Sequence, residues 1–213
     1  MDYNKLIFRI SVAVLIIIYA VGLAGFLSVY KDQMIRLTPY TLLLSLFLLL
    51  VNQREWDRFI ILFGVSVMLA GFLVEVFGVK TGILFGQYHY DHALGYKLLD
   101  VPLLIGVNWF VLTFSTGMIT NLLKINRFWR AVVAATLMVA LDFSLEPVAM
   151  AYDFWSWEAS MVPIKNYISW FVISLVFQGL FQGLRLKMIN RFAIILFLVQ
   201  WVFFLSLSLT LDH

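Results

Sequence analysis

The sequence predicts an all-α polytopic membrane protein with about seven transmembrane helices. Of its 213 residues, 63% are hydrophobic and 13% are charged, whereas a soluble domain is about half apolar and about a quarter charged. Apolar runs of about twenty residues, the length of a helix that crosses a bilayer, recur along nearly the whole chain. The strands of a β-barrel would instead alternate polar and apolar residues. We therefore expect a single transmembrane domain over residues 1–213.

Seven segments have the length and composition of membrane spans. The first follows Lys5 and Arg9 and is longer than the apolar core of a signal peptide, so we expect it to be the first span. The second is the shortest, and Pro39 near its start suits a first helical turn. Short polar turns or longer aromatic connections separate the others. The expected spans are residues 6–29, 35–51, 59–78, 102–122, 128–148, 164–184 and 191–210.

The lysine and arginine residues predict the orientation of these spans. Ten of the 15 lie on one side of the predicted spans and five on the other, and cytoplasmic loops carry an excess of such residues. We therefore expect a protein of the cell membrane with its N-terminus in the cytoplasm and its C-terminus outside. The two longer connections, about residues 79–101 and 149–163, then face outward. Their aromatic residues and glycines are typical of ordered, functional loops.

Three carboxylates lie inside the apolar segments: Glu75, Asp142 and Glu146. A charged side chain in the bilayer is costly, so such residues usually face an internal cavity and have a function there. At 1.5 Å per residue, Glu75 lies about 24 Å along the third span, and the other two lie about 21 and 27 Å along the fifth. Asp142 and Glu146 are four residues apart and share one helix face. Asp100, at the mouth of the fourth span, lies on the same side of the membrane.

Carboxylates in this setting could perform acid–base catalysis. A carboxyl group in apolar surroundings keeps its proton more readily than one in water, so Glu75 is a candidate proton donor. Asp142 and Glu146 could share a proton. One protonated acid beside one ionised carboxylate is the usual arrangement for general acid–base chemistry. The structural alternative is that these acids bind one another, the backbone or helix ends.

Aromatic residues crowd the two outward connections and the starts of the helices that follow them. Tryptophan and tyrosine often form belts at the membrane surface. Aromatic faces also stabilise cations, including a carbocation that water cannot solvate. Asn108 and Asn166 could bind the acids or a water, or join helices to one another. The aromatic candidates are Tyr88, Tyr90, Trp109, Trp155, Trp157 and Trp170.

A weak internal repeat relates two parts of the chain. Val101-Pro102 and Val162-Pro163 are each followed by a tryptophan seven residues after the proline. Each pair opens a predicted helix that follows an acid-bearing helix, so two helical hairpins could face each other across one pocket. Chance similarity between apolar segments is the alternative.

The composition also excludes several kinds of chemistry. The chain has no cysteine, which removes disulfides, thiolate metal sites, iron–sulfur clusters and cysteine nucleophiles. It has three histidines, too few for a membrane di-iron enzyme, and His89 and His92 are expected to be solvated at the interface rather than to bind a metal. The last span lacks the lysine that holds retinal in rhodopsins. The small net charge of +3 gives no indication of a nucleic-acid partner.

The order of these motifs resembles the carotenoid hydratase family of integral membrane proteins, which act on γ-carotene-type ψ ends or on bisanhydrobacterioruberin. The resemblance runs from Glu75 to Trp170. The sequence departs from the family pattern at Asp153 and Met161, where glycines are expected. The matching motifs are Glu75, Phe85-Gly86-x-Tyr88-x-Tyr90, Leu94-Gly95, Val101-Pro102, Asn108-Trp109, Asp142-x3-Glu146-Pro147-x-Ala149, Trp155-x-Trp157, Val162-Pro163, Asn166 and Trp170.

The resemblance implies a hydro-lyase that adds water to the terminal C1–C2 double bond of an acyclic carotenoid end. Glu75 or Asp142 would donate the proton and Glu146 would orient the water, with Asp100 as a further catalytic candidate. The aromatic residues and the two asparagines would surround the substrate, and no cofactor or metal would be needed. The carotenoid would enter from the membrane lipid, and water would be the co-substrate. The sequence leaves the oligomeric state open.

Two other functions stay open at this point. A carotenoid end-group cyclase would also protonate an isoprenoid end but would capture the cation with a second double bond. A proton-coupled transporter or an accessory membrane subunit belongs to a different class, and a transporter should show paired broken helices near the middle of the membrane.

Overall fold

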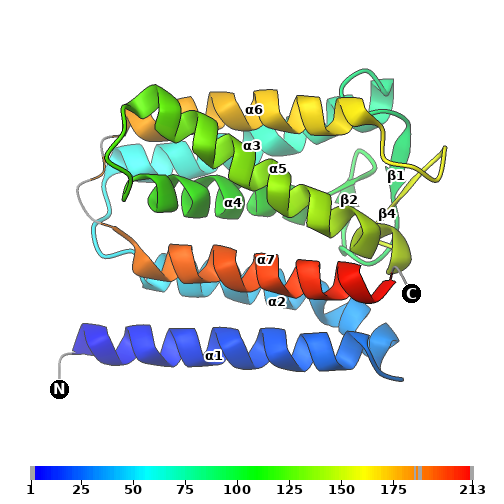
Figure 1. The fold of residues 1–213 in the computed structure, drawn as a ribbon, viewed down its shortest axis with the longest axis horizontal. Coiled ribbons are helices and arrows are strands. Elements are labelled where there is room, and N and C mark those ends of the chain that lie inside the picture. The colour runs from blue at the N-terminus through cyan, green and yellow to red at the C-terminus, as the bar shows by residue number, and fades with distance from the viewer. Residues whose placement is uncertain (1–2, 185, 187–188, 212–213) are drawn as a thin grey trace.

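The computed structural model describes residues 3–184, 186 and 189–211 as a bundle of seven helices (Figure 1). The two termini lie at opposite ends of the bundle, as an odd number of spans requires. The elements follow one another as α1 (Tyr3–Phe26), α2 (Lys31–Val51), α3 (Arg58–Thr81), β1 (Tyr88–Tyr90), β2 (Lys97–Leu98), β3 (Val101–Pro102), α4 (Leu104–Thr120), α5 (Arg127–Ala151), β4 (Trp155–Trp157), α6 (Ile164–Gly183) and α7 (Arg191–Leu211).

Polar residues fix the ends of the two helices that carry the carboxylates. The Asp57 side chain accepts hydrogen bonds from the backbone N–H groups of Phe59 and Ile60, each at 2.8 Å, and so caps α3. Gly82, with φ of +64°, ends that helix in the left-handed conformation that glycine adopts readily. Asn126 caps α5 by accepting from the N–H of Trp129 at 3.0 Å.

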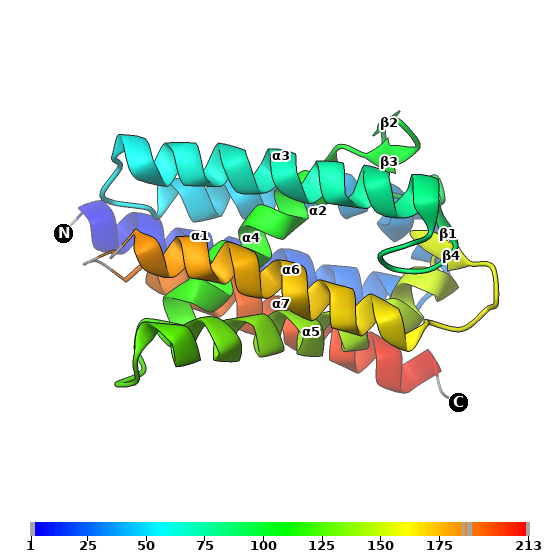
Figure 2. The ribbon, with the colours of Figure 1, turned by 90° about the horizontal axis from the view of Figure 1, so that it is seen from above.

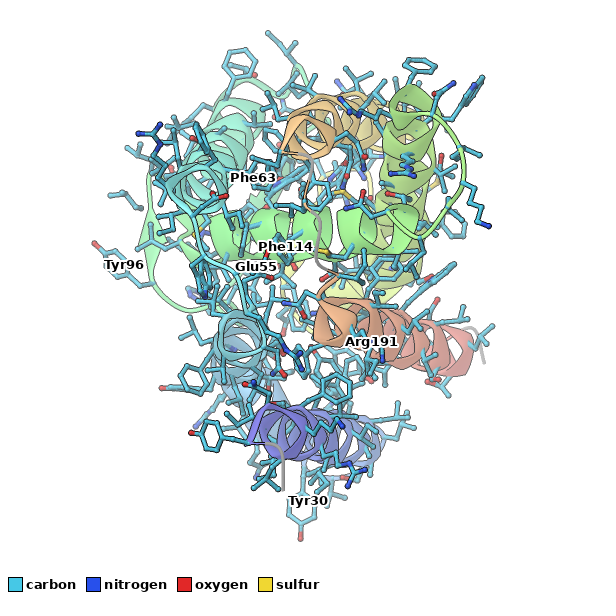
Figure 3. All side chains as sticks on the ribbon, turned by 90° about the vertical axis from the view of Figure 1, so that its left-hand side faces the viewer. Tyr30, Glu55, Phe63, Tyr96, Phe114 and Arg191 are labelled. Carbon is cyan, nitrogen blue, oxygen red and sulfur yellow. The ribbon has the colours of Figure 1, made fainter. Side chains whose placement is uncertain are left out.

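The helices confirm the all-α polytopic membrane class. Six of the helices in the described residues are long and apolar enough to cross a membrane. The exception is α4, which has 17 residues instead of the 21 predicted and crosses the bundle obliquely (Figures 2 and 3). It is shorter because residues 101–102 pair in a strand and residues 121–125 form a turn followed by bends. Since α4 packs against α2, α3, α5, α6 and α7, other helices shield it from lipid.

Close approach of α3 and α4 depends on small residues. A Cβ atom at Gly106 would lie 2.4 Å from the backbone oxygen of Met68, and one at Gly71 would lie 2.6 Å from Cγ of Trp109. Glycine is therefore needed at both positions for the backbones to come this near. As a result the Trp109 side chain is fully buried against α3, the helix that carries Glu75.

The two longer connections, residues 79–101 and 149–163, pair with each other, which the sequence reasoning did not predict. Strands β1 and β4 run antiparallel, with Tyr88 opposite Trp157 and Tyr90 opposite Trp155. Side chains alternate between the faces of a strand, so these four aromatic residues are buried while His89 is exposed. Polar contacts around β1 hold it to β4 and to β2.

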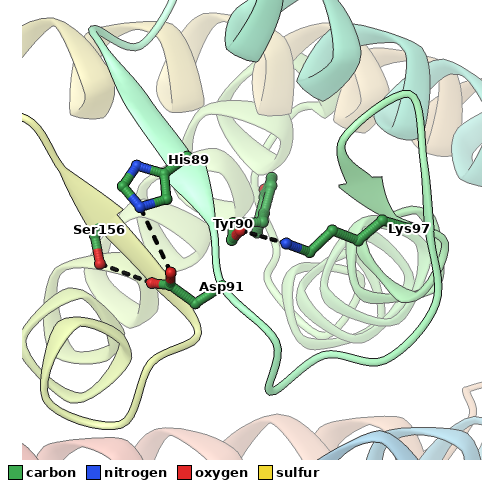
Figure 4. Close-up of polar contacts among 5 residues, drawn as sticks. All are labelled: His89, Tyr90, Asp91, Lys97 and Ser156. Carbon is green, nitrogen blue, oxygen red and sulfur yellow. Dashed lines mark hydrogen bonds and ion pairs between the residues drawn. The ribbon is translucent and has the colours of Figure 1, made fainter.

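Figure 4 shows these contacts. The hydroxyl of Ser156 donates to Asp91 at 2.7 Å, and His89 lies 3.5 Å from the other oxygen of Asp91. The Lys97 ammonium donates to the carbonyl oxygen of Tyr90 at 2.5 Å. Asp153, just before β4, has φ of +56°, a conformation that favours glycine and that fits the glycine expected near this position.

Candidate active site

A small cavity of about 30 Å³ lies between α3, α5, α6 and the β1–β4 pair, and we call it the acid chamber. Glu75, Asp142 and Glu146 all line it, and each is at most 2% exposed. The structure thus brings together the carboxylates that the sequence placed at one depth. Each buried water needs a cavity of about 10–15 Å³, so the chamber has room for about two waters.

Three donors bind the Glu75 carboxylate. The hydroxyls of Tyr88 and Tyr90 donate to its Oε2 at 2.6 and 2.8 Å, and Nε1 of Trp109 donates to Oε1 at 3.0 Å. Burial, followed by the negative charge of Glu75, raises the pKa of both tyrosines, which lie outside the membrane-spanning helices. Both therefore remain neutral hydroxyls that can donate to the carboxylate.

Glu146 is held in the same way by the second connection. Nε1 of Trp155 and Nε1 of Trp157 donate to its Oε2 at 2.9 and 2.8 Å. Nδ2 of Asn166 donates to Oε1 at 3.2 Å. An indole nitrogen is only a donor, so Oε2 of Glu146 can only be an acceptor in this arrangement.

The two glutamates occupy equivalent places in two helical hairpins, α3–α4 and α5–α6. Each lies on the first helix of its hairpin, and each is bound by two aromatic residues two positions apart on the strand that follows that helix. Trp109 and Trp170, the tryptophans of the internal repeat, stack with ring centroids 4.0 Å apart and planes inclined by 16°. The hairpins of the repeat therefore meet across the acid chamber.

Asp142 differs from both glutamates. Its Oδ2 accepts from Nδ2 of Asn166 at 3.1 Å, the same nitrogen that binds Glu146. Its Oδ1 is buried and has no hydrogen-bond partner among the described residues. Burying an acceptor without a partner is unfavourable by about 1–3 kcal/mol. Asp142 is therefore the carboxyl that has an oxygen available for a substrate or a water.

An apolar cavity of about 410 Å³ borders the acid chamber and has a lipid-facing edge on α1 and α2. Four residues line both cavities: Ile105, Asn108, Leu145 and Trp155. At the other side it is lined by Ile17 and Val21, whose side chains are exposed on the face of α1. A long apolar molecule could therefore reach the acids from the bilayer.

The structure does not bring Asp100 to the chamber. Leu99 and Asp100 form the turn of the β2–β3 hairpin with positive φ angles of 53° and 69°. The turn directs Asp100 to the surface, where its side chain is 71% exposed and forms an ion pair with Lys80. The hydrogen bond from Lys80 lowers the pKa of the Asp100 carboxyl, which is therefore ionised at neutral pH.

The remaining candidates from the sequence line the chamber or its walls. Tyr88, Tyr90, Trp155, Trp157, Asn166 and Trp170 line it, Asn108 lies where it meets the apolar cavity, and Trp109 binds Glu75. Sequence reasoning missed Ile105 and Leu145 at that junction. Both are ordinary apolar residues of apolar helices. Only the rotation of each helix about its axis shows that they face the junction of the two cavities.

Comparison with known proteins gives two matches. The model of a family described as carotenoid biosynthesis protein matches residues 34–212. A curated relative, the bisanhydrobacterioruberin hydratase of Haloarcula japonica, is 34% identical over 127 residues, which are 55% of this chain and 43% of that protein. The match thus covers less than half of the relative's length. No solved structure matches this chain.

Proposed function

We propose that this chain, which belongs to the carotenoid biosynthesis protein family, is a carotenoid hydratase. The family membership confirms the resemblance found in its motifs and, together with the acid chamber, supports the proposal. The reaction is addition of water across the C1–C2 double bond of an acyclic ψ end. The observation that carries the proposal is the buried pair of Asp142, which has an unpartnered oxygen, and Glu146, beside an apolar cavity.

In this proposal Asp142 is the general acid. Its proton passes to C2, the electrons of the double bond form the new C2–H bond, and a tertiary cation remains at C1. Glu75 is a poorer donor than Asp142, because three donors already occupy its two oxygens. The negative charge of Glu75 instead stabilises the cation, together with the aromatic faces around the chamber.

Glu146 is the general base. A water in the chamber attacks C1, and Glu146 takes the proton that this water loses, so that a tertiary alcohol forms. The proton then returns from Glu146 to Asp142, which are neighbours because Oε1 of Glu146 and Oδ2 of Asp142 both accept from Nδ2 of Asn166. The cycle consumes one water and no other reagent.

The acid chamber favours hydration over cyclisation. Its volume of about 30 Å³ accommodates about two waters, and hydration needs a water beside the cation whereas cyclisation does not. The helices that bear the acids, α3 and α5, are also continuous through the described residues, unlike the broken helices typical of transporters. Both observations support the hydratase over the alternatives that the sequence left open.

Expression in a host that accumulates lycopene or γ-carotene tests the proposal. We expect a new pigment heavier than the substrate by the mass of one water, and in water labelled with heavy oxygen the label should enter the new hydroxyl. A new pigment of unchanged mass would indicate a cyclase. Unchanged pigments, in cells whose membranes contain the protein, would contradict both enzymes.

A further inference from the structure

A second cavity, of about 600 Å³, lies at the other end of the bundle, where α1 and α7 begin and α2 ends. Segments far apart in the sequence each contribute cations to its lining: Lys5, Arg9, Arg54 and Arg191. Figure 3 views the molecule from this end, with Arg191 at the start of α7. It is the membrane face that the distribution of lysine and arginine predicts to be cytoplasmic.

These charges have no acidic partner in the part of the chain that the structure describes, and Glu55, next to Arg54, forms no ion pair with them. No aspartate or glutamate is among the described residues that line the cavity, and none of the four cations forms an ion pair within the part of the chain that the structure describes. On the same loop as Arg54, the carboxylate of Asp57 is occupied in capping α3. Four like charges around one cavity repel one another, so an anion there is favourable.

Polar side chains that line the cavity are already engaged in hydrogen bonds with one another and with the backbone. Nδ2 of Asn190 donates to Oε1 of Gln53 at 3.1 Å and to the backbone oxygen of Leu49 at 3.3 Å. Oδ1 of Asn190 accepts from the N–H of Ala193 at 3.2 Å and caps α7. These bonds fix the start of α7 beside the end of α2, and the positive end of the α7 dipole adds to the four cations.

We propose that this basic cavity binds the phosphate group of an anionic phospholipid. The cations form the headgroup site, and the aromatic side chains of Phe8 and Phe192 give the cavity an apolar part suited to the start of an acyl chain. Basic pockets between membrane helices bind anionic headgroups in this way. The site lies apart from the acid chamber, so the proposal does not depend on the hydratase activity.

Native mass spectrometry of the detergent-purified protein tests this site. The probes are phosphatidylglycerol and phosphatidylcholine of matched acyl chains, and the readout is the fraction of protein that retains a lipid. The test variant combines Arg9→Gln, Arg54→Gln and Arg191→Gln. The control variant combines Arg58→Gln, Lys124→Gln and Arg127→Gln, which neutralises three exposed cations on the same membrane face but outside the cavity.

We expect the wild type and the control to retain phosphatidylglycerol in preference to phosphatidylcholine. In the test variant, the fraction of protein that retains phosphatidylglycerol should fall by about tenfold or more. Equal losses in both variants would show attraction to the whole charged face and would overturn the proposal. Equal retention of the two lipids by the wild type would do the same. Displacement of phosphatidylglycerol by millimolar inorganic phosphate would identify a soluble anion as the ligand instead.

Discussion

Asp142→Asn separates the catalytic role proposed for this residue from any role in folding. The amide has the shape of the carboxyl, and its oxygen can still accept from Nδ2 of Asn166 as Oδ2 of Asp142 does. The NH₂ group of the amide takes the place of Oδ1, which has no hydrogen-bond partner among the described residues, so no hydrogen bond is lost. We therefore expect thermal stability to stay within about 1 kcal/mol of the wild type. Without an acidic proton, however, hydration should slow by about 100- to 10,000-fold.

The assay is conversion of lycopene or γ-carotene by the protein in membranes, followed by chromatography and mass spectrometry of the pigments. Asp100→Asn is the matched control, because Asp100 is exposed and lies outside the acid chamber. We expect that variant to match the wild type. An Asp142→Asn variant that converts substrate within about threefold of the wild-type rate would refute the assignment of Asp142 as the general acid.

Three further variants test other parts of the structure. Glu146→Gln should abolish conversion and also destabilise the protein by about 1–3 kcal/mol. Both oxygens of Glu146 accept hydrogen bonds, so the NH₂ group of the new glutamine must face a donor. An unchanged melting temperature would contradict this. Gly106→Ala should lower thermal stability by about 1–3 kcal/mol, since its Cβ would meet the backbone oxygen of Met68, whereas Gly179→Ala, with no atom within 4 Å, should not. Leu145→Trp should obstruct the junction of the two cavities and stop pigment conversion while the protein still accumulates in the membrane.

The sequence predicted the helices and the depth of the acids well, because both depend on position along the chain. Runs of apolar residues determine where a membrane helix lies, and the rise per residue places Glu75 level with Asp142 and Glu146. The extent of α4 was overestimated for the same reason, since Val101-Pro102 is apolar yet belongs to a hairpin.

The sequence could not predict the rotation of the helices about their axes or the pairing of the strands. The roles proposed for Asp142 and Glu146 differ because indole donors reach Glu146 and not Asp142, and that depends on the pairing of β1 with β4 across 65 residues of chain. Asp100 was grouped with the other acids only because it lies at the mouth of the fourth span on the same side of the membrane. Its exposure follows from the backbone conformation of a two-residue turn, which no apolar pattern reveals.

The origin of the proton at C2 tests the central claim most directly. Conversion of lycopene by the purified protein in deuterated water, with nuclear magnetic resonance of the product, reports where hydrogen from the solvent enters. Transfer through Asp142 predicts a single deuterium at C2 beside a tertiary hydroxyl at C1, and no such product from the Asp142→Asn variant. A hydroxylated product without deuterium at C2, or a deuterated product formed equally well by that variant, would contradict acid–base hydration in this chamber.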